Sequence, residues 1–218
     1  MKNSTGAMSL IELTVVLALV AILGSLLLAL VSKGQRQAQG LICLNHLRQW
    51  GLATQWYIHE ADGMLPPEGS PNGLSRERGW YVTLPALLGL ELYHEAEWRT
   101  NASTPLKRSL WHCPSNDRRS NGRNLFQYCL NGQVDGSGNR DLPISILGIA
   151  APSKAVWMFD NGGLAAVARQ NNVHTNIHRG GADLLYLDGS ARWFEVAEYW
   201  DFRRDRGRVD NPDIDWSP

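Results

Sequence analysis

The sequence lacks an excess of charge of either sign, because 21 lysines and arginines balance 21 aspartates and glutamates. A nucleic-acid-binding domain usually carries a basic patch or stripe, so no nucleic-acid partner is expected. The sequence also lacks a G-x-S-x-G motif, a phosphate-binding glycine loop and a convincing Cys–His pair. These absences favour a protein that is not an enzyme.

Cysteine is scarce, with only Cys43, Cys113 and Cys129 in 218 residues. No two of them form a C-x-x-C motif, so a zinc knuckle is not expected. Three cysteines fit an oxidising compartment, with one disulfide and one spare thiol. Their spacing leaves all three pairings open.

Charge is also missing from residue 13 to residue 31, a run of 19 residues that is long enough to span a bilayer as a helix. A secretory signal has a shorter apolar core, of about 7–15 residues, followed by a small-residue cleavage site. A carboxylate, Glu12, stands at the start of the run. A plain membrane anchor does not explain this acid, which is costly near a bilayer.

The leader MKNSTGA followed by SLIEL resembles the N-terminus of type IV prepilins and pseudopilins. The resemblance implies that a prepilin peptidase cuts between Ala7 and Met8 and so removes residues 1–7. A methyltransferase then caps the new amine. Glu12 becomes the fifth mature residue and pairs with the α-amino group of a neighbouring subunit. The family usually has glycine and phenylalanine at this junction, so cleavage after Gly6 is the alternative.

Helical spacing continues beyond the apolar run to about residue 60. An apolar stripe recurs every three or four residues, at Cys43, Leu47, Trp50, Thr54 and Tyr57. The pattern predicts one helix of about 50 residues, with a transmembrane part over 8–31 and a part over 32–60 that packs on a globular head. The alternative is two helices broken near Gly34. Ala29 stands where many relatives have proline, so the helix should be straight there.

The remaining residues, 61–218, predict a small α+β head. Apolar runs predict strands over 125–130 and 155–159, and a hairpin from 184–187 and 190–194 around a two-residue Asp188-Gly189 turn. Short helices are expected over 80–90, interrupted by Pro85, and over 195–204. The predicted fold is a long N-terminal helix packed on a small antiparallel sheet.

Five segments resemble, in the same order, a large pseudopilin-like family common in planctomycete-type and related bacteria. They are CLNHLRQWGLATQWY, WHCPSND, FQYCLNG, PSKAVWMFDNG and HRGGADLLYLDGSARW. The last carries the family's C-terminal signature of His178, nine residues, then Asp188-Gly189. The resemblance implies a pilin-like α+β head.

The disulfide can be predicted in two ways. Cys113 and Cys129 flank a polar loop, so local proximity slightly favours their pairing. The family pattern instead carries the equivalents of Cys43 and Cys113. Both predictions use Cys113.

No catalytic metal is expected. A structural calcium is the weaker alternative to a metal-free head, with Asp160, Asn161 and Asp188 as oxygen ligands; the family's secretion pseudopilins often hold one. His178 is expected near the Asp188 end of the hairpin or hydrogen-bonded to its loop, in a structural role.

Nine tryptophans leave a second function open, because exposed tryptophans can stack on glycans. Trp50, Trp56, Trp157 and Trp193 lie on apolar stripes and are expected in the core. The other five lie in more polar surroundings: Trp80, Trp98, Trp111, Trp200 and Trp216.

The sequence therefore predicts a single-pass inner-membrane subunit with a periplasmic head, which assembles with other pilin-like subunits into a type IV pilus or a type II secretion pseudopilus. The alternatives are a membrane-tethered periplasmic domain that stacks exposed tryptophans on glycans, and an anchored hydrolase.

Overall fold

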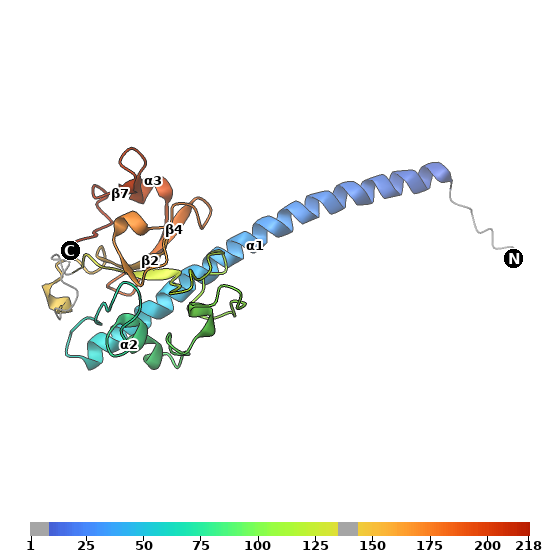
Figure 1. Cartoon of the computed structure of the whole chain (residues 1–218). Helices are drawn as coiled ribbons and strands as arrows, with labels where there is room; N and C mark the ends of the chain where they lie inside the picture. Colours follow the sequence, from blue (N-terminus) through green and yellow to red (C-terminus); the bar gives the residue numbers. More distant parts are fainter. Residues whose placement is uncertain (1–8, 135–143) are drawn as a thin grey trace. The chain divides into compact units, whose positions relative to one another are not determined.

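The computed structural model describes residues 9–134 and 144–218 (Figure 1). The chain divides into two compact units: the first ends at Ala38 and the second begins at Gln39. Each unit is considered by itself. The predicted cleavage junction at Ala7 and Met8 lies outside the described residues.

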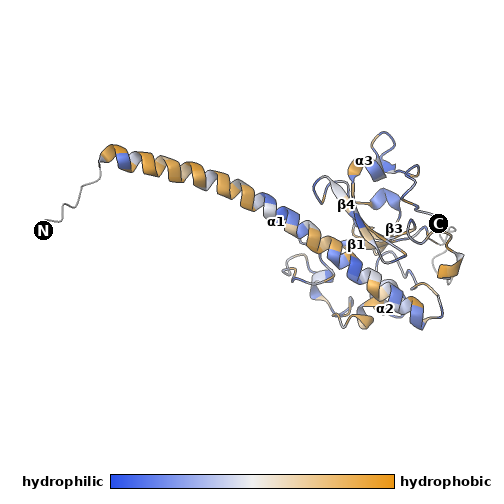
Figure 2. Ribbon diagram, turned by 180° about the vertical axis from the view of Figure 1, so that it is seen from behind, coloured by the Kyte–Doolittle hydropathy of each residue, from blue (hydrophilic) through white to orange (hydrophobic). Residues whose placement is uncertain are grey.

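Helix α1 (Leu10–Glu60) is continuous over 51 residues. The single long helix is therefore confirmed, and the predicted alternative of a break near Gly34 is wrong. Its N-terminal part is apolar and unburied, and it is long and apolar enough to cross a membrane (Figure 2). The helix starts with a reciprocal pair of hydrogen bonds: the Ser9 N–H donates to Glu12 Oε2 at 2.8 Å, and the Glu12 N–H donates to Ser9 Oγ at 3.2 Å. This is a capping box, which gives Glu12 a structural role within its own chain.

The C-terminal half of α1 buries the predicted stripe. Cys43, Leu47 and Trp50 have no exposed surface, and Thr54 is buried with them. The Trp157 indole donates a hydrogen bond to Thr54 Oγ1 at 3.0 Å, which fastens the helix to the sheet. Trp56 was expected in the core, but it is 59% exposed because it lies on the opposite side of the helix from this stripe.

The main sheet has five strands in the order β3-β1-β2-β4-β5. They are β1 (Tyr128–Asn131), β2 (Val156–Asp160), β3 (Val167–Ala168), β4 (Gly181–Tyr186) and β5 (Ala191–Glu195). The pairs β1–β2, β2–β4 and β4–β5 are antiparallel, as predicted, but β3 is parallel to β1, so the sheet is mixed. The short β3 was not predicted.

Both faces of the sheet are covered. Strands β1, β2 and β4 are buried at every residue. Trp157 and Leu185 join the core that includes the α1 stripe, whereas Val156 and Phe159 pack with the C-terminal Trp200 and Trp216. Burial on two faces explains why these strands appear in the sequence as continuous apolar runs instead of alternating ones.

The hairpin between β4 and β5 is present, with a loop one residue longer than predicted. The Tyr186 N–H donates to Ser190 O, which leaves Leu187, Asp188 and Gly189 in the loop. Gly189 has φ +84°, the left-handed conformation that closes a three-residue hairpin loop. The requirement for glycine at this position is therefore confirmed.

The remaining elements are short. The helix expected over 80–90 is present as α2 (Trp80–Leu87), but it runs through Pro85 instead of being interrupted there. Short 3₁₀ turns occupy Glu97–Arg99, Ile146–Gly148 and Gln170–Asn172. The predicted helix over 195–204 is wrong beyond its first turn: α3 is Val196–Tyr199. The chain then enters β6 (Trp200–Asp201), which pairs with β7 (Arg206–Gly207). Backbone pairing with β7 replaces further helical turns.

Candidate functional site

A disulfide joins α1 to the head, between Cys43 and Cys113. The prediction that Cys113 forms the bridge is confirmed, and so is the pairing implied by the family resemblance. The slightly preferred pairing of Cys113 with Cys129 is wrong, because Cys129 is a buried free cysteine. Its neighbours Tyr128 and Leu130 belong to the core beneath α1, whereas Cys129 packs in the core on the other face. Strand alternation thus turns Cys129 away from Cys113.

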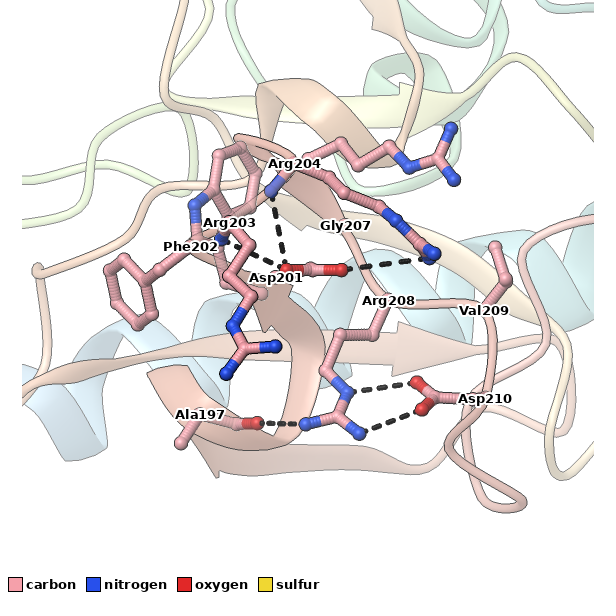
Figure 3. Close-up of a pocket in the computed structure, with 11 residues that line it drawn as sticks. Ala197, Asp201, Phe202, Arg203, Arg204, Gly207, Arg208, Val209 and Asp210 are labelled. Atoms are coloured by element: carbon pink, nitrogen blue, oxygen red, sulfur yellow. Dashed lines mark hydrogen bonds and ion pairs between the residues drawn. The ribbon is translucent and has the colours of Figure 1, made fainter.

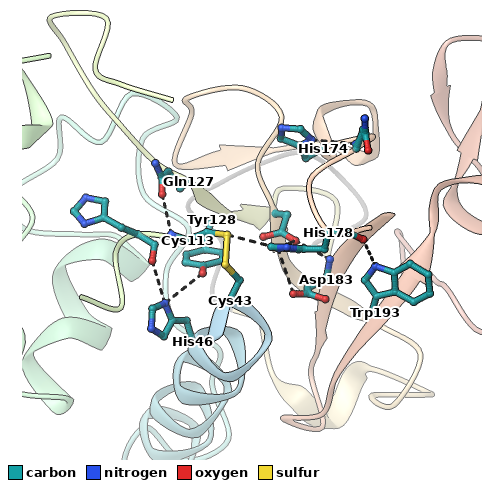
Figure 4. A network of polar contacts seen from close by, with 12 residues as sticks. Cys43, His46, Cys113, Gln127, Tyr128, His174, His178, Asp183 and Trp193 are labelled. Atoms are coloured by element: carbon teal, nitrogen blue, oxygen red, sulfur yellow. Dashed lines mark hydrogen bonds and ion pairs between the residues drawn. A yellow bond between two sulfur atoms is a disulfide. The ribbon is translucent and has the colours of Figure 1, made fainter. Parts of the chain in front are cut away.

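Beside this disulfide lies a buried cluster of three ionisable side chains, which we call the Asp–His–Asp cluster: Asp160, His178 and Asp183 (Figure 4). His178 Nε2 is 3.1 Å from Asp160 Oδ2 and 3.5 Å from Asp183 Oδ2. The same nitrogen is 3.5 Å from Cys113 Sγ. All three residues are at most 3% exposed, so the cluster is sealed from solvent.

The sheet places the two carboxylates. Asp160 ends β2 and Asp183 lies in β4, and the register pairs the adjacent residues Phe159 and Leu184. The Asp183 N–H donates to Asp160 Oδ2 at 2.7 Å. Asp160 and Asp183 are therefore the next pair of residues along the β2–β4 ladder. The Asp160 carboxylate accepts the hydrogen bond that the Asp183 N–H donates.

A tight turn places the histidine. His178 and Gly181 exchange backbone hydrogen bonds at 3.1 Å, and the two residues between them, Arg179 and Gly180, have φ values of +56° and +85°. Positive φ at both central positions is the geometry of a type I′ hairpin turn. The Trp193 indole of β5 donates to His178 O at 2.7 Å. The imidazole is thus held from both its own turn and the neighbouring strand.

Burial and mutual charge control protonation in the cluster. Burial, reinforced by the Asp160 carboxylate, raises the pKa of Asp183 to about 8. Burial lowers the pKa of His178, but the charge and hydrogen bond of Asp160 outweigh this effect and leave the pKa raised. Both shifts favour the protonated forms of Asp183 and His178.

Several atoms of the cluster have no hydrogen-bond partner among the described residues. They are Asp160 Oδ1, His178 Nδ1 and Asp183 Oδ2. A buried polar atom without a partner is costly, by about 1–3 kcal/mol in mutational studies. The ligand atoms of the three residues all lie within 4.8 Å of one another, which is close enough to hold a metal ion.

The predicted signature residues do not meet. His178 lies at the open end of the hairpin, whereas Asp188 is in the loop at the other end, exposed, with Oδ1 accepting the Ser190 N–H. The expectation that His178 lies near Asp188 is therefore wrong. His178 does contact the strands of the hairpin: its backbone carbonyl accepts the Trp193 indole N–H, and its Nε2 is 3.5 Å from Asp183 Oδ2.

The predicted calcium ligands do not form a site. Asp160 and Asp188 lie at opposite ends of the β2–β4 ladder, because Phe159 pairs with Leu184 while Val156 pairs with Tyr186. Both N–H groups of the Asn161 amide are used, since they donate to Phe126 O and Ala165 O, and its Oδ1 accepts the Gly163 N–H. Asp183 was not among the predicted calcium ligands, although an acid in an otherwise apolar strand was a signal of a buried polar site.

Surface hollows also occur among the described residues of the head, including the following two. One, of about 900 Å³, lies between α1 and residues 106–119, with Ile42, Leu106 and Arg119 among its lining residues. The other, of about 410 Å³, lies around the arginine-rich segment 200–210 (Figure 3). There Arg208 makes two 2.8 Å contacts with Asp210, and Arg204 pairs with Asp201 at 3.7 Å. Both ion pairs lie at the surface, where such pairs contribute little to stability.

Comparisons with protein-family models, curated proteins and solved structures found no match to this chain.

Proposed function

We propose that the chain is a membrane-anchored, non-enzymatic subunit of a type IV pilin-like filament or a type II secretion pseudopilus. The observation that carries the proposal is the single helix α1. Its uncharged N-terminal part is unburied, and its C-terminal part buries a stripe against an α+β head. A filament subunit needs both parts: the first holds it in the inner membrane and then packs with other subunits, and the second fixes the head.

The disulfide supports a head in the periplasm, since such bonds persist in oxidising compartments. A prepilin peptidase would cut between Ala7 and Met8, as the family resemblance implies. In the assembled filament, Glu12 would exchange its contact with Ser9 for the α-amino group of a neighbouring subunit.

The two alternatives receive less support. Glycan stacking needs exposed rings, but the five tryptophans expected in polar surroundings are all at most 7% exposed, namely Trp80, Trp98, Trp111, Trp200 and Trp216. The head packs them as core residues, for example with Trp50 and Trp80 in edge contact at 5.4 Å. Among the described residues, Trp56 on α1 is the single tryptophan with an exposed ring, at 59%. A hydrolase would need substrate access to its catalytic groups, and the Asp–His–Asp cluster is sealed.

The capping box allows a sharp test of Glu12. Glutamine can close the same box, so Glu12→Gln removes the charge and keeps the helix start. We expect this variant to insert in the membrane with a folded head but to be absent from sheared or cross-linked filaments. Ser9→Ala is the matched control, because it weakens the cap and keeps the acid; it should assemble. Normal assembly of Glu12→Gln would contradict the proposal, as would equal failure of both variants.

A further inference from the structure

We propose that Asp160, His178 and Asp183 bind one divalent first-row metal ion of the zinc class, as a structural site inside the head. The proposal is independent of filament assembly. It rests on the geometry of the three ligand atoms, on their unsatisfied lone pairs and on their charge.

The distances fit a tetrahedral ion. Zinc binds imidazole nitrogen and carboxylate oxygen at about 2.0–2.2 Å, so two ligand atoms on a tetrahedron lie about 3.4 Å apart. The two measured separations from His178 Nε2 are 3.1 Å to Asp160 Oδ2 and 3.5 Å to Asp183 Oδ2. The three ligand atoms all lie within 4.8 Å of one another, a range that one ion can bridge.

A metal ion satisfies more atoms than a proton does. One proton on His178 Nε2 can be donated to Asp160, which leaves Asp183 Oδ2 without a hydrogen bond. An ion in the same place would contact Nε2 and an oxygen of each carboxylate together. Asp160 Oδ1 also has no partner and supplies a fourth donor if that carboxylate binds through both oxygens.

Charge and burial point in the same direction. When both carboxylates are ionised, a divalent ion balances their two charges and leaves the imidazole neutral, so binding displaces the protons that the metal-free cluster holds. Calcium fits poorly, because it takes six to eight oxygen ligands, whereas a nitrogen lies at the centre of this cluster. Cys43 and Cys113 lie beside the cluster, but their disulfide occupies both sulfur atoms, so they are not ligands in the oxidised protein.

The test uses the full-length chain in detergent, with its disulfide intact by thiol titration. The chain is stripped with a chelator, exposed to zinc or to cobalt(II), and desalted. We expect one zinc per chain by elemental analysis, a visible cobalt(II) spectrum typical of four-coordination, and a rise in the thermal midpoint with zinc but not with calcium.

Asp183→Asn is the decisive variant, because it keeps the shape and removes one charged ligand. Losing even an outer-shell partner costs about 10–100-fold in metal affinity, so losing a ligand should cost at least about 100-fold. Asp188→Asn on the same hairpin is the matched control and should bind as the wild type does. Near-UV circular dichroism shows whether each variant is folded. If Asp183→Asn is misfolded, His178→Gln is tested in its place, and the same loss is expected. The proposal is overturned if the wild type retains no zinc, if calcium gives the same shift, or if folded Asp183→Asn or His178→Gln binds like the wild type.

Discussion

A buried histidine makes the head sensitive to acid. His112 is 5% exposed, its Nε2 has no hydrogen-bond partner among the described residues, and its ring meets Trp98 edge-on with centroids 4.4 Å apart. Burial is the main cause that lowers its pKa to about 4; Arg119 and His46 add to the effect, and the Lys107 carbonyl opposes it. In the unfolded chain the pKa returns to about 6.5. The unfolded state therefore takes up the proton first as the pH falls.

The first prediction follows from the lowered pKa of His112 in the folded state. The stability that depends on neutral His112 is complete above about pH 6.5 and is lost as the pH falls towards 4. Between pH 7.5 and pH 5 this residue should cost about 2 kcal/mol, at about 1.4 kcal/mol per pH unit below 6.5. That loss is about 4–8 °C in the thermal midpoint for a domain of this size. In His112→Gln the acid-induced drop should shrink by this amount. An unchanged drop would show that other groups control it.

A second prediction concerns Gly189. A Cβ at this position would meet only Gln55 Cγ, at an ordinary 3.5 Å, so the obstacle to other residues is the backbone angle of +84°. Gly189→Val should destabilise the head by more than about 1 kcal/mol, because β-branched residues are strained there. Gly189→Asn is the control, since asparagine tolerates this conformation better. Thermal unfolding in which valine and asparagine behave alike would contradict the prediction.

At the scale of elements, α1 packs closely against the β4–β5 hairpin at Gly51. A Cβ there would lie 2.8 Å from Leu185 Cδ1 and 3.0 Å from Gly189 O. The helix and hairpin are also joined by Gln55, whose amide donates to Leu187 O at 2.6 Å. A small residue is therefore needed at this crossing.

The third prediction compares two glycines of the same helix. Gly51→Ala should destabilise the head by about 1–3 kcal/mol through overpacking, despite the higher helix propensity of alanine. Gly34 has no atom within 4 Å of an added Cβ, so Gly34→Ala should be neutral or stabilising by up to about 1 kcal/mol. Chemical unfolding followed by tryptophan fluorescence measures both. Equal effects would mean that the close approach at Gly51 is unimportant.

The fourth prediction concerns the link between α1 and the head. The disulfide joins residues 70 apart in sequence, and in the chain-entropy relation a loop of that length contributes about 4 kcal/mol. Cys113→Ala should therefore lower the unfolding free energy by several kcal/mol. Cys129→Ala should cost only the lost packing of a small side chain, about 1 kcal/mol. A similar loss in the two variants would contradict the observed pairing.

At the scale of the whole molecule, the apolar N-terminal part of α1 and the folded head have separate roles in the proposed subunit. Only cleavage of the leader would make Glu12 the fifth residue of a chain that begins with a free amine. The fifth prediction is that the chain purified from its native membrane begins at Met8, which intact-mass analysis detects. A mature N-terminus at residue 1, or a cut near residue 31, would contradict the proposed processing, and a start at Ala7 would identify the alternative junction after Gly6.

The sequence by itself determined the features that depend on local spacing. The apolar run and the stripe from Cys43 to Thr54 predict a single helix, because helical periodicity is written in neighbouring residues. The continuous apolar strands and the Asp188-Gly189 loop were predictable for the same reason. Glycine at 189 was required by a local backbone angle.

Only the tertiary structure decided what lies next to what. Asp160, His178 and Asp183 come from two strands and a turn, and the strand register that brings them together leaves no local pattern. The face of the sheet on which Cys129 lies depends on the register of β1, because a shift of one residue would move its side chain to the other face. The disulfide partner of Cys113 depends on that face. The burial of five tryptophans in polar segments has the same origin, because the core they enter is built by residues distant in the chain.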